Sequence, residues 1–258
     1  MENNKTHIAI VLAGGRGSRM NSTVPKQYML LADRPVLYYS LKCMEESFID
    51  YIILVCGQGD EDYCQSEIVD KYGFNKVVSI TAGGEQRYDS VYNGLKQIDC
   101  LGIAEDSSYV YIHDGARPCI DIPLLEACRD SAVSYGATVP AVPVKDTIKV
   151  IDNEGFCVAT PERSSLMAVQ TPQCFFFETA WLAYSRMKRA ALDGADISGI
   201  TDDAMVVEQY TKTRVKLCEG SYNNIKITTP EDLFIAAGIL EKRRSNELCK
   251  NAKCKKNL

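Results

Sequence analysis

Short apolar segments alternate with amphipathic segments along most of the chain. The apolar runs at 8–12, 51–56, 76–80 and 109–113 have the length and β-branched content of buried strands. Helical periodicity lies between them, as in the stretch that opens at Pro35 and places Leu37, Leu41 and Met44 on one face. Further predicted helices cover about 61–72, 86–98, 122–135, 176–193, 202–210 and 229–243. This alternation predicts an α/β fold, a Rossmann-like and mostly parallel sheet with helices on both faces.

The alternation stops between residues 137 and 172, where extended segments follow one another. Residues 146–151 and 156–159 flank a turn at Asn153-Glu154-Gly155, a pattern typical of a β-hairpin. We expect a β-arm at about 144–165. Its exposed valines and isoleucines need cover, which either a second subunit or the arm's own domain can provide. The sequence leaves these two alternatives open.

The length of 258 residues suits one large domain, which we place at residues 1–243. The last predicted helix starts at Thr229-Pro230-Glu231-Asp232, a capping box with proline at the first helical position. Residues 244–258 are rich in lysine and weakly patterned, so we expect a basic, disordered tail there.

A glycine-rich segment, LAGGRGSRM at 12–20, directly follows the first predicted strand. Its glycines allow a sharp turn that brings backbone N–H groups close to an anion. Arg16, Arg19 and Lys26 add cations suited to a triphosphate. A dinucleotide fingerprint is disfavoured because Met20 stands at the third glycine position, and a P-loop because Lys26 follows a proline. The simpler alternative is an ordinary glycine-rich turn.

Composition and charge exclude several classes of partner. The net charge of −5 does not favour a nucleic-acid or anionic-membrane partner, so the phosphate-binding cations must act locally. No apolar run is long enough for a transmembrane helix, and the first residues lack the apolar core of a signal peptide. The eleven cysteines contain no C-x-x-C pair, which indicates reduced thiols in a cytoplasmic protein. With only two histidines, His7 and His113, a zinc site is not expected.

Polar clusters follow several of the predicted strands at the point where each ends. They are the glycine-rich loop, Gly84 with Arg87 and Ser90, residues 114–117 with Asp114 and Arg117, and residues 224–226. Because open parallel sheets bind ligands at the carboxyl ends of their strands, we expect these clusters to share one rim.

Taken together, these segments resemble the 2-C-methyl-D-erythritol 4-phosphate cytidylyltransferases of the non-mevalonate isoprenoid pathway. The matching segments are LAGGRGSRM at 12–20 with PKQY at 25–28, HDGARP at 113–118, VKDTIK at 144–149, Arg163 with QTPQ at 170–173, TDD at 201–203 and NNIKITTPEDL at 223–233. They keep the family's order and span about residues 7–240.

The resemblance implies a role for each candidate site residue. Ala13, Gly14, Gly15 and Gly17 would wrap CTP, with Gly84, Ser90 and Gly115 around its base and ribose and with Arg87 and Arg117 beside them. Arg19 and Lys26 would stabilise the charge that develops on the triphosphate. Thr147, Arg163, Thr171 and Lys226 would hold the sugar phosphate, and Asp114 would contact its hydroxyls. In the family, Thr147 and Arg163 lie on an arm offered to the neighbouring subunit of a homodimer.

The implied reaction is attack of a substrate phosphate oxygen on the α-phosphorus of CTP, with release of pyrophosphate. The nucleophile is already ionised, so catalysis depends on positioning and on charge neutralisation. Mg²⁺ would be bound mainly through the triphosphate. Alternatives are the same reaction on ribitol 5-phosphate or another polyol phosphate, since LAGG at 12–15 also occurs in ribitol-5-phosphate cytidylyltransferases, and a non-catalytic nucleotide-binding regulator.

Overall fold

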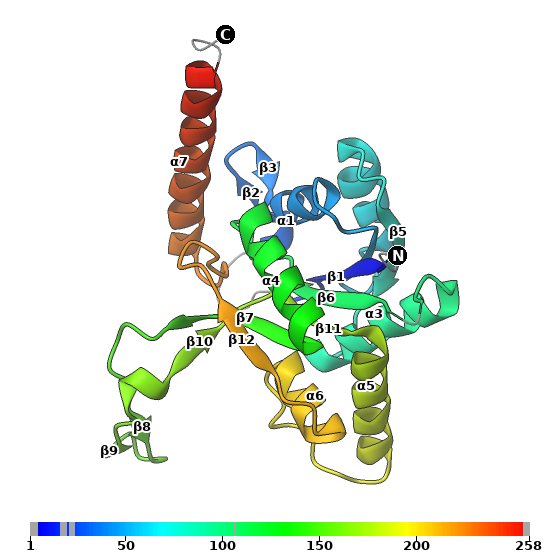
Figure 1. Cartoon of the computed structure of the whole chain (residues 1–258), viewed down its shortest axis with the longest axis vertical. Coiled ribbons are helices and arrows are strands. Elements are labelled where there is room, and N and C mark those ends of the chain that lie inside the picture. The colour runs from blue at the N-terminus through cyan, green and yellow to red at the C-terminus, as the bar shows by residue number, and fades with distance from the viewer. Residues whose placement is uncertain (1–4, 16–19, 21–23, 106, 255–258) are drawn as a thin grey trace.

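The centre of the molecule is a twisted mixed sheet in which parallel pairs predominate (Figure 1). A computed structural model describes residues 5–15, 20, 24–105 and 107–254, with side chains described as far as residue 246. The strands of this sheet are β1 (His7–Ala13), β4 (Tyr51–Cys56), β5 (Val77–Ala82), β6 (Tyr109–Asp114), β7 (Ala137–Pro143), β10 (Met167–Val169), β11 (Gln173–Phe176) and β12 (Lys216–Glu219). They are ordered β10-β7-β11-β6-β1-β4-β5, with β12 paired to β7.

Parallel pairing joins β5, β4, β1 and β6, the strands of the repeated βα units. In contrast, β11 runs antiparallel to both β6 and β7, and β10 runs antiparallel to β7. The predicted mostly parallel sheet is therefore confirmed. Its antiparallel part begins where the sequence loses the βα alternation. There β7 and β10 are joined by residues 144–166 without a crossover helix, so β10 returns antiparallel to β7.

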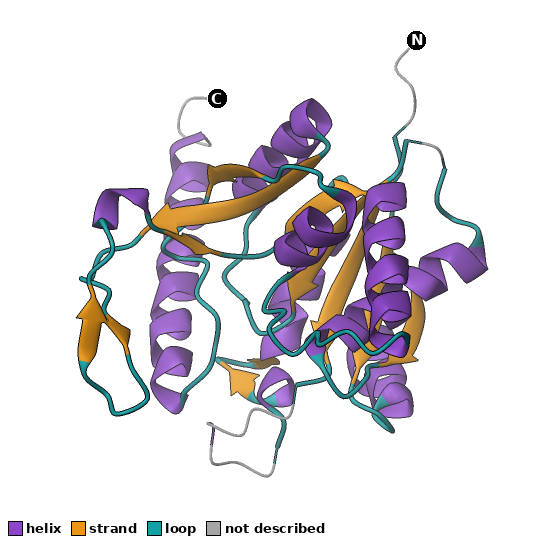
Figure 2. Cartoon of the chain, turned by 90° about the horizontal axis from the view of Figure 1, so that it is seen from below, coloured by secondary structure: helices purple, strands orange, loops and turns teal. Residues whose placement is uncertain are grey.

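Helices cover both faces of the sheet, as predicted (Figure 2). They are α1 (Val36–Glu45), α2 (Glu61–Tyr63) continued by the π-helical η3 (Cys64–Asp70), α3 (Arg87–Leu101), α4 (Ile122–Tyr135), α5 (Phe177–Leu192), α6 (Asp203–Thr211) and α7 (Pro230–Cys254). Short 3₁₀ turns are η2 (Lys26–Tyr28) and η4 (Arg163–Ser165). A small hairpin of β2 (Leu30–Leu31) and β3 (Arg34–Pro35) precedes α1.

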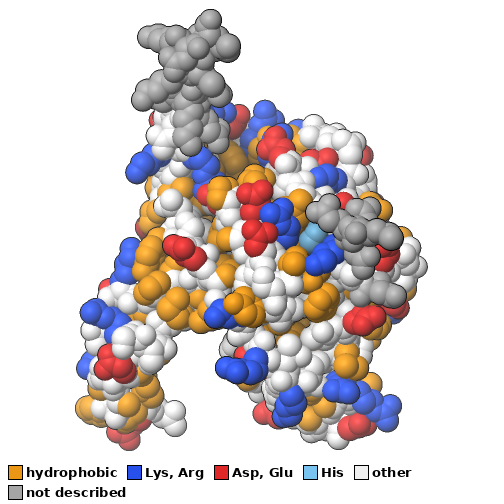
Figure 3. Space-filling view, in the orientation of Figure 1, with side chains coloured by type: hydrophobic (Ala, Val, Ile, Leu, Met, Phe, Trp, Pro, Cys, Tyr) orange, Lys and Arg blue, Asp and Glu red, His pale blue; other side chains and the backbone are white. Residues whose placement is uncertain are grey.

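Residues 144–166 form an arm that extends away from the body of the molecule (Figures 1 and 3). Its hairpin consists of β8 (Val150–Ile151) and β9 (Cys157–Ala159), and the turn between them uses Gly155 at a φ of +88°. Within the chain the arm therefore projects, and it does not fold back on its own domain. The hairpin strands are shorter than the sequence predicted, because the extended residues 146–149 have no partner strand in the described chain.

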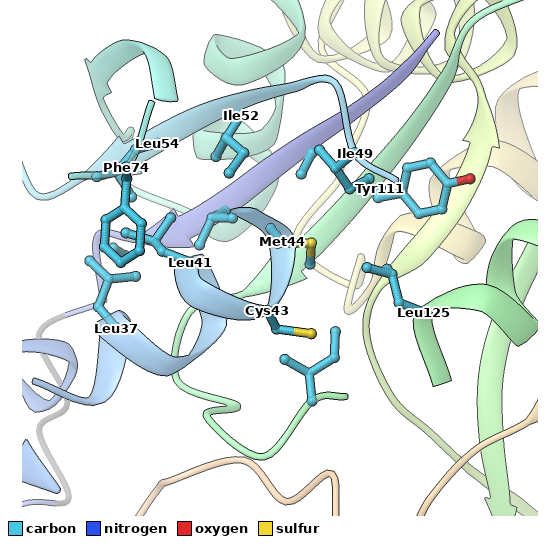
Figure 4. Packing of buried hydrophobic residues seen from close by; sticks show 14 of the residues in the cluster. Leu37, Leu41, Cys43, Met44, Ile49, Ile52, Leu54, Phe74, Tyr111 and Leu125 are labelled. Atoms are coloured by element: carbon cyan, nitrogen blue, oxygen red, sulfur yellow. The ribbon is translucent and has the colours of Figure 1, made fainter. Parts of the chain in front are cut away.

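Two apolar clusters, one on each face, hold the layers together. On one face α1 contributes Leu37, Leu41 and Met44, which pack with side chains of β4, β6 and α4 (Figure 4). On the other face Val91 and Leu95 of α3 pack with buried residues of α5 and α6. Alternate residues of β1 point to opposite faces, as the period of a strand requires: Ala9 and Val11 are fully buried on one face, and Ile8 and Ile10 on the other.

Helix α7 continues to Cys254, beyond the predicted end at residue 243. Residues 244–254 are helical in the structure, so the expectation of a disordered tail from residue 244 is wrong for them. The first part of α7 packs on the body through a third apolar cluster. Among the described side chains, this cluster joins Ala236 to Ile227 and Val36. Beyond residue 243 the helix extends outward from the body (Figure 1), which agrees with the weak apolar pattern of the sequence there.

Candidate active site

A cavity of about 220 Å³ opens at the carboxyl ends of β1 and β6. It is lined by Leu12, Ala13, Gly14, Gly15, Lys26, Gln27, Gly84, Glu85, Gln86, Arg87, Ser90, Asp114, Ala116 and Lys226. A wider hollow of about 860 Å³ continues from it past Gly57 and Gly83, sharing Gly14 and Gly15 as walls. The sequence clusters predicted to share one rim therefore do so.

Backbone hydrogen bonds fix the strand ends around this cavity. The N–H of Gly115 donates to the carbonyl of Leu12 at 2.8 Å, and the N–H of Gly83 donates to the carbonyl of Cys56 at 2.8 Å. A Cβ atom at position 115 would lie 3.0 Å from the oxygen of Leu12, so glycine is required for this close approach. The loops after the strands are thus held against the sheet before any ligand binds.

Three cations surround the carboxylate of Asp114, which ends β6. Lys226 Nζ lies 2.7 Å from its Oδ2, Arg87 Nε lies 3.3 Å from its Oδ1, and Arg117 Nε lies 3.7 Å from Oδ2. Burial alone would raise the pKa of Asp114, but the positive charges of Arg87, Lys226 and Arg117 outweigh burial and hold that pKa well below its usual range. Asp114 is therefore ionised near neutral pH.

Arg87, at the start of α3, connects Asp114 with a second carboxylate. Its Nη1 and Nη2 lie 2.6 and 2.7 Å from the two oxygens of Asp203, a bidentate pair. The hydroxyl of Tyr184 donates to Oδ1 of Asp203 at 2.5 Å. Burial lowers the pKa of Arg87, yet the charges of Asp203 and Asp114 raise it well above its ordinary value, so the guanidinium remains charged.

A buried network behind Asp114 fixes its backbone. The N–H of Asp114 donates to Oγ1 of Thr171 at 3.1 Å, and that hydroxyl also lies 3.0 Å from Nδ1 of His113. Asn224 donates from its side chain to the carbonyl of Thr171 at 2.9 Å. Burial lowers the pKa of His113 to about 4, so the ring is neutral near pH 7. Thr171 thus holds the strand end, and it lies behind the cavity wall.

Lys26 enters the cavity from η2 and donates from Nζ to the carbonyl of Ile227 at 2.8 Å. Its neighbour Gln27 is buried and donates from Nε2 to the carbonyl of Ala13, which ties η2 to the end of β1. Lys26 and Lys226 therefore both line the cavity, and the carbonyl that accepts from Lys26 belongs to the residue that follows Lys226. Arg19 and Gly17, also assigned to the site from the sequence, lie outside the described residues.

These groups make the cavity suited to a polyanion. Lysine and arginine side chains line the cavity together with Gly14 and Gly15, whose backbone N–H groups can approach phosphate oxygens. One ionised carboxylate lies among them and can accept hydrogen bonds from hydroxyl groups.

Comparisons with known proteins agree with this geometry. The sequence profile of the 2-C-methyl-D-erythritol 4-phosphate cytidylyltransferases matches residues 7–242. A protein of that name from Lachnospira eligens is 48% identical over 234 residues, which are 90% of this chain and 98% of that protein. The chain belongs to this family. It is therefore a CTP-dependent cytidylyltransferase, a nucleotidyltransferase of the non-mevalonate isoprenoid pathway.

Solved structures of the family have the same fold. A 4-diphosphocytidyl-2C-methyl-D-erythritol synthase from Anaerococcus prevotii matches with a TM-score of 0.74 and 32% identity, over 92% of this chain and 96% of that one. A 2-C-methyl-D-erythritol 4-phosphate cytidylyltransferase from Francisella tularensis matches with a TM-score of 0.73 and 27% identity, over 91% and 100%.

The structure brings most of the residues assigned from the family resemblance together. The cavity wall includes Ala13, Gly14, Gly15, Lys26, Gly84, Arg87, Ser90, Asp114 and Lys226. Gly115, Arg117 and Thr171 lie directly behind it, and Arg117 donates to the carbonyl of Asn224 at 2.8 Å. Thr147 and Arg163 are exposed on the arm, where Arg163 donates to the carbonyl of Lys145 at 3.1 Å. Their roles, like those of the wall residues, stay predictions.

Sequence reasoning did not assign Asp203, Tyr184 or Gln27 to the site. Asp203 belongs to the TDD segment at 201–203, which matched the family but received no role. Its signal was therefore present in the sequence, although the pairing with Arg87 joins residues 116 positions apart.

None of the described helices combines the length and apolar character that a membrane span requires. The nine cysteines whose side chains are described are free thiols, and most of them are buried.

Proposed function

We propose that this chain carries out the family's reaction in the cavity described above, transferring CMP from CTP to 2-C-methyl-D-erythritol 4-phosphate and releasing pyrophosphate. The observation that carries the proposal is the position of Lys226 and Asp114, an ion pair of 2.7 Å, on the same wall as the Gly14–Gly15 turn. A nucleotide on the turn would present its α-phosphorus to an acceptor held by the ion pair.

The chemistry follows from the charges. The attacking phosphate oxygen is ionised near neutral pH, so no general base is needed, and the barrier comes from bringing two anions together. Lys26 would stabilise the charge that develops on the triphosphate as pyrophosphate leaves. Arg19 is assigned the same task from the family resemblance.

The acceptor would lie against Asp114 and Lys226. Asp114 is ionised and fixed by its cations, so its oxygens accept hydrogen bonds from polyol hydroxyls. Lys226 Nζ would contribute a positive charge near the acceptor phosphate.

The arm would complete the acceptor site of a second subunit in a homodimer. Thr147 and Arg163 lie on the arm with exposed side chains, and the hairpin exposes large apolar groups: Ile151 is 61% exposed, Phe156 67% and Val158 60%. Contiguous exposed apolar side chains favour a protein partner. In a second copy of the chain, the acceptor site would hold the phosphate that Arg163 would bind.

Mg²⁺ would be held mainly by the triphosphate. The carboxylates of the cavity wall are Glu85 and Asp114, and Asp114 already pairs with three cations. The described residues contain no cluster of three or more side chains able to hold a metal ion. This donor set fits a hard cation that keeps most of its ligands as phosphate oxygens and water, and that neutralises phosphate charge when bound. The free thiols support a cytoplasmic location.

The test is pyrophosphate release from CTP with Mg²⁺ and a panel of acceptors. We expect the highest kcat/KM with 2-C-methyl-D-erythritol 4-phosphate, little turnover with UTP or ATP, and loss of activity when EDTA removes the divalent ion. A preference for ribitol 5-phosphate would contradict the proposed acceptor but not the proposed reaction, the transfer of CMP with release of pyrophosphate. CTP binding without pyrophosphate release from any acceptor would overturn the proposal and leave a nucleotide-binding regulator.

A further inference from the structure

Asp203 is a fully buried carboxylate at the start of α6. Its neighbour Asp202 caps this helix, accepting the N–H of Met205 at 2.9 Å, so Asp203 is not needed as the cap. A buried carboxylate destabilises the fold unless it is paired and hydrogen-bonded. Its presence therefore requires a specific partner.

That partner is a residue of the cavity wall. Both oxygens of Asp203 are engaged by the Nη atoms of Arg87, and the hydroxyl of Tyr184 adds a further hydrogen bond to Oδ1. Tyr184 itself is fully buried in α5. Asp203 is not part of the cavity wall, whereas Arg87 is.

The bidentate pair fixes the direction of the third nitrogen of Arg87. A guanidinium is planar, so holding both Nη atoms also sets where Nε points. Here Nε points to Oδ1 of Asp114 at 3.3 Å. The chain of contacts Tyr184–Asp203–Arg87–Asp114 runs from the core to the rim.

Asp203 also balances charge next to the cavity. Arg87, Arg117 and Lys226 carry three positive charges around the single carboxylate of Asp114. Burial and the charge of Arg87 lower the pKa of Arg117, an indication of repulsion between the two guanidinium groups. The negative charge of Asp203 lies on the far side of Arg87 and offsets part of that repulsion.

We propose that Asp203, backed by Tyr184, is a positioning residue for the transfer reaction: it fixes Arg87 so that Arg87 holds Asp114 in the orientation that receives the acceptor. The inference rests on the proposed function. It adds a role for the TDD segment, whose second aspartate would act through Arg87 without touching either substrate.

The experiment compares Asp203→Asn with Tyr184→Phe in the full-length protein, measuring kcat and KM for the acceptor and, separately, CTP affinity by calorimetry without acceptor. Asn keeps the shape and one acceptor oxygen but loses the charge. We expect acceptor kcat/KM to fall about 10–100-fold for Asp203→Asn and about tenfold for Tyr184→Phe. CTP affinity should change less than about threefold, because the three guanidinium nitrogens of Arg87 are engaged by Asp203 and Asp114, and Gly14 and Gly15 do not contact Asp203.

The matched control is Asp121→Asn. Asp121 also stands at a helix start and pairs with an arginine, Arg243, at 3.0 Å, but it lies outside the cavity wall. Its loss should leave acceptor kcat/KM within about twofold of the parent.

A double variant separates positioning from general support of the fold. If Asp203 acts through Arg87, then Arg87→Gln combined with Asp203→Asn should be no worse than Arg87→Gln alone, within about twofold. Multiplicative losses in the double variant, or an Asp203→Asn protein that behaves like Asp121→Asn, would overturn the inference. If Asp203→Asn does not fold, Tyr184→Phe decides, and parent-like kinetics of that variant would overturn it. An inactive parent protein would instead contradict the proposed function.

Discussion

The rim around Asp114 and the arm at 144–166 are built in opposite ways. Around Asp114, ion pairs of 2.6–3.7 Å join buried and half-buried side chains from α3, from β6 and the loop after it, from α6 and from the segment after β12. The arm has a hairpin of two and three residues and exposes more than half of Ile151, Phe156 and Val158. The rim is thus fixed by contacts within one chain, whereas these apolar side chains of the arm are exposed to solvent in the single chain. The rim is therefore preformed within one chain, whereas the arm would contribute to a site only in the proposed homodimer.

The largest effect on catalysis should come from a change in the preformed cavity. Lys26→Ala should lower kcat about 100–1,000-fold, because it removes a positive charge of the cavity wall that in the proposed reaction would stabilise the triphosphate. The unfolding midpoint should stay close to that of the parent. The measurement is steady-state pyrophosphate release together with thermal unfolding.

Lys42→Ala is the matched control, since Lys42 is half-buried on α1, pairs with Glu46 at 2.8 Å and lies outside the cavity wall. It should keep parent kinetics. A near-normal kcat for Lys26→Ala would remove Lys26 from the reaction.

A smaller effect should follow from changes on the arm. Ile151→Asp combined with Phe156→Asp places like charges on exposed apolar positions, so it should weaken assembly without disturbing the body of the chain. We expect a single-chain mass by analytical ultracentrifugation and acceptor kcat/KM about 10–100-fold lower.

Leu192→Asp serves as its control, because Leu192 is 82% exposed at the end of α5. That variant should keep the parent mass and activity. A monomeric arm variant with full activity would show that each chain completes its own acceptor site.

The smallest effect concerns the stability of the rim against acid. His113 has its pKa lowered to about 4 by burial in the folded chain, whereas an unfolded histidine titrates near about 6.5. Between these values the unfolded chain binds more protons, so stability falls as pH falls. The free energy of unfolding should drop by about 2 kcal/mol from pH 7 to pH 5 through this group.

His113→Asn should make that pH dependence shallower in urea unfolding at the two pH values. Asp114 does not interfere, since its pKa is held well below the usual range and its stabilisation is lost only at lower pH. The remaining slope includes His7, whose pKa is also lowered by burial. An unchanged slope in His113→Asn would show that His113 does not titrate as a buried neutral ring.

The same contrast explains what the sequence could reveal. Gly84, Arg87, Asp114 and Lys226 were predicted to meet because each follows a strand, and strand ends of a parallel sheet share one edge. That argument needs only local patterns and the fold class. It placed the cavity correctly without any long-range contact.

The partners behind the rim could not be found this way. Arg87 and Asp203 pair because α6 packs beside α5 and α3, and no local pattern encodes that arrangement. The direction of the arm also depends on its surroundings: its apolar residues suit cover by its own domain as well as by another chain. The predicted helix at 229–243 ends earlier than α7 does, because residues 244–254 lack the periodicity of a packed helix.

The two roots of the arm lie next to each other on the sheet. Met167 of β10 is paired with Pro143 of β7, and the N–H of Val144 donates to the carbonyl of Leu166 at 3.4 Å. Insertions or deletions between these roots can therefore alter the reach of the arm while the register of β7 is retained. In the proposed homodimer, such changes would shift Thr147 and Arg163 relative to the acceptor while the rim around Asp114 keeps its geometry.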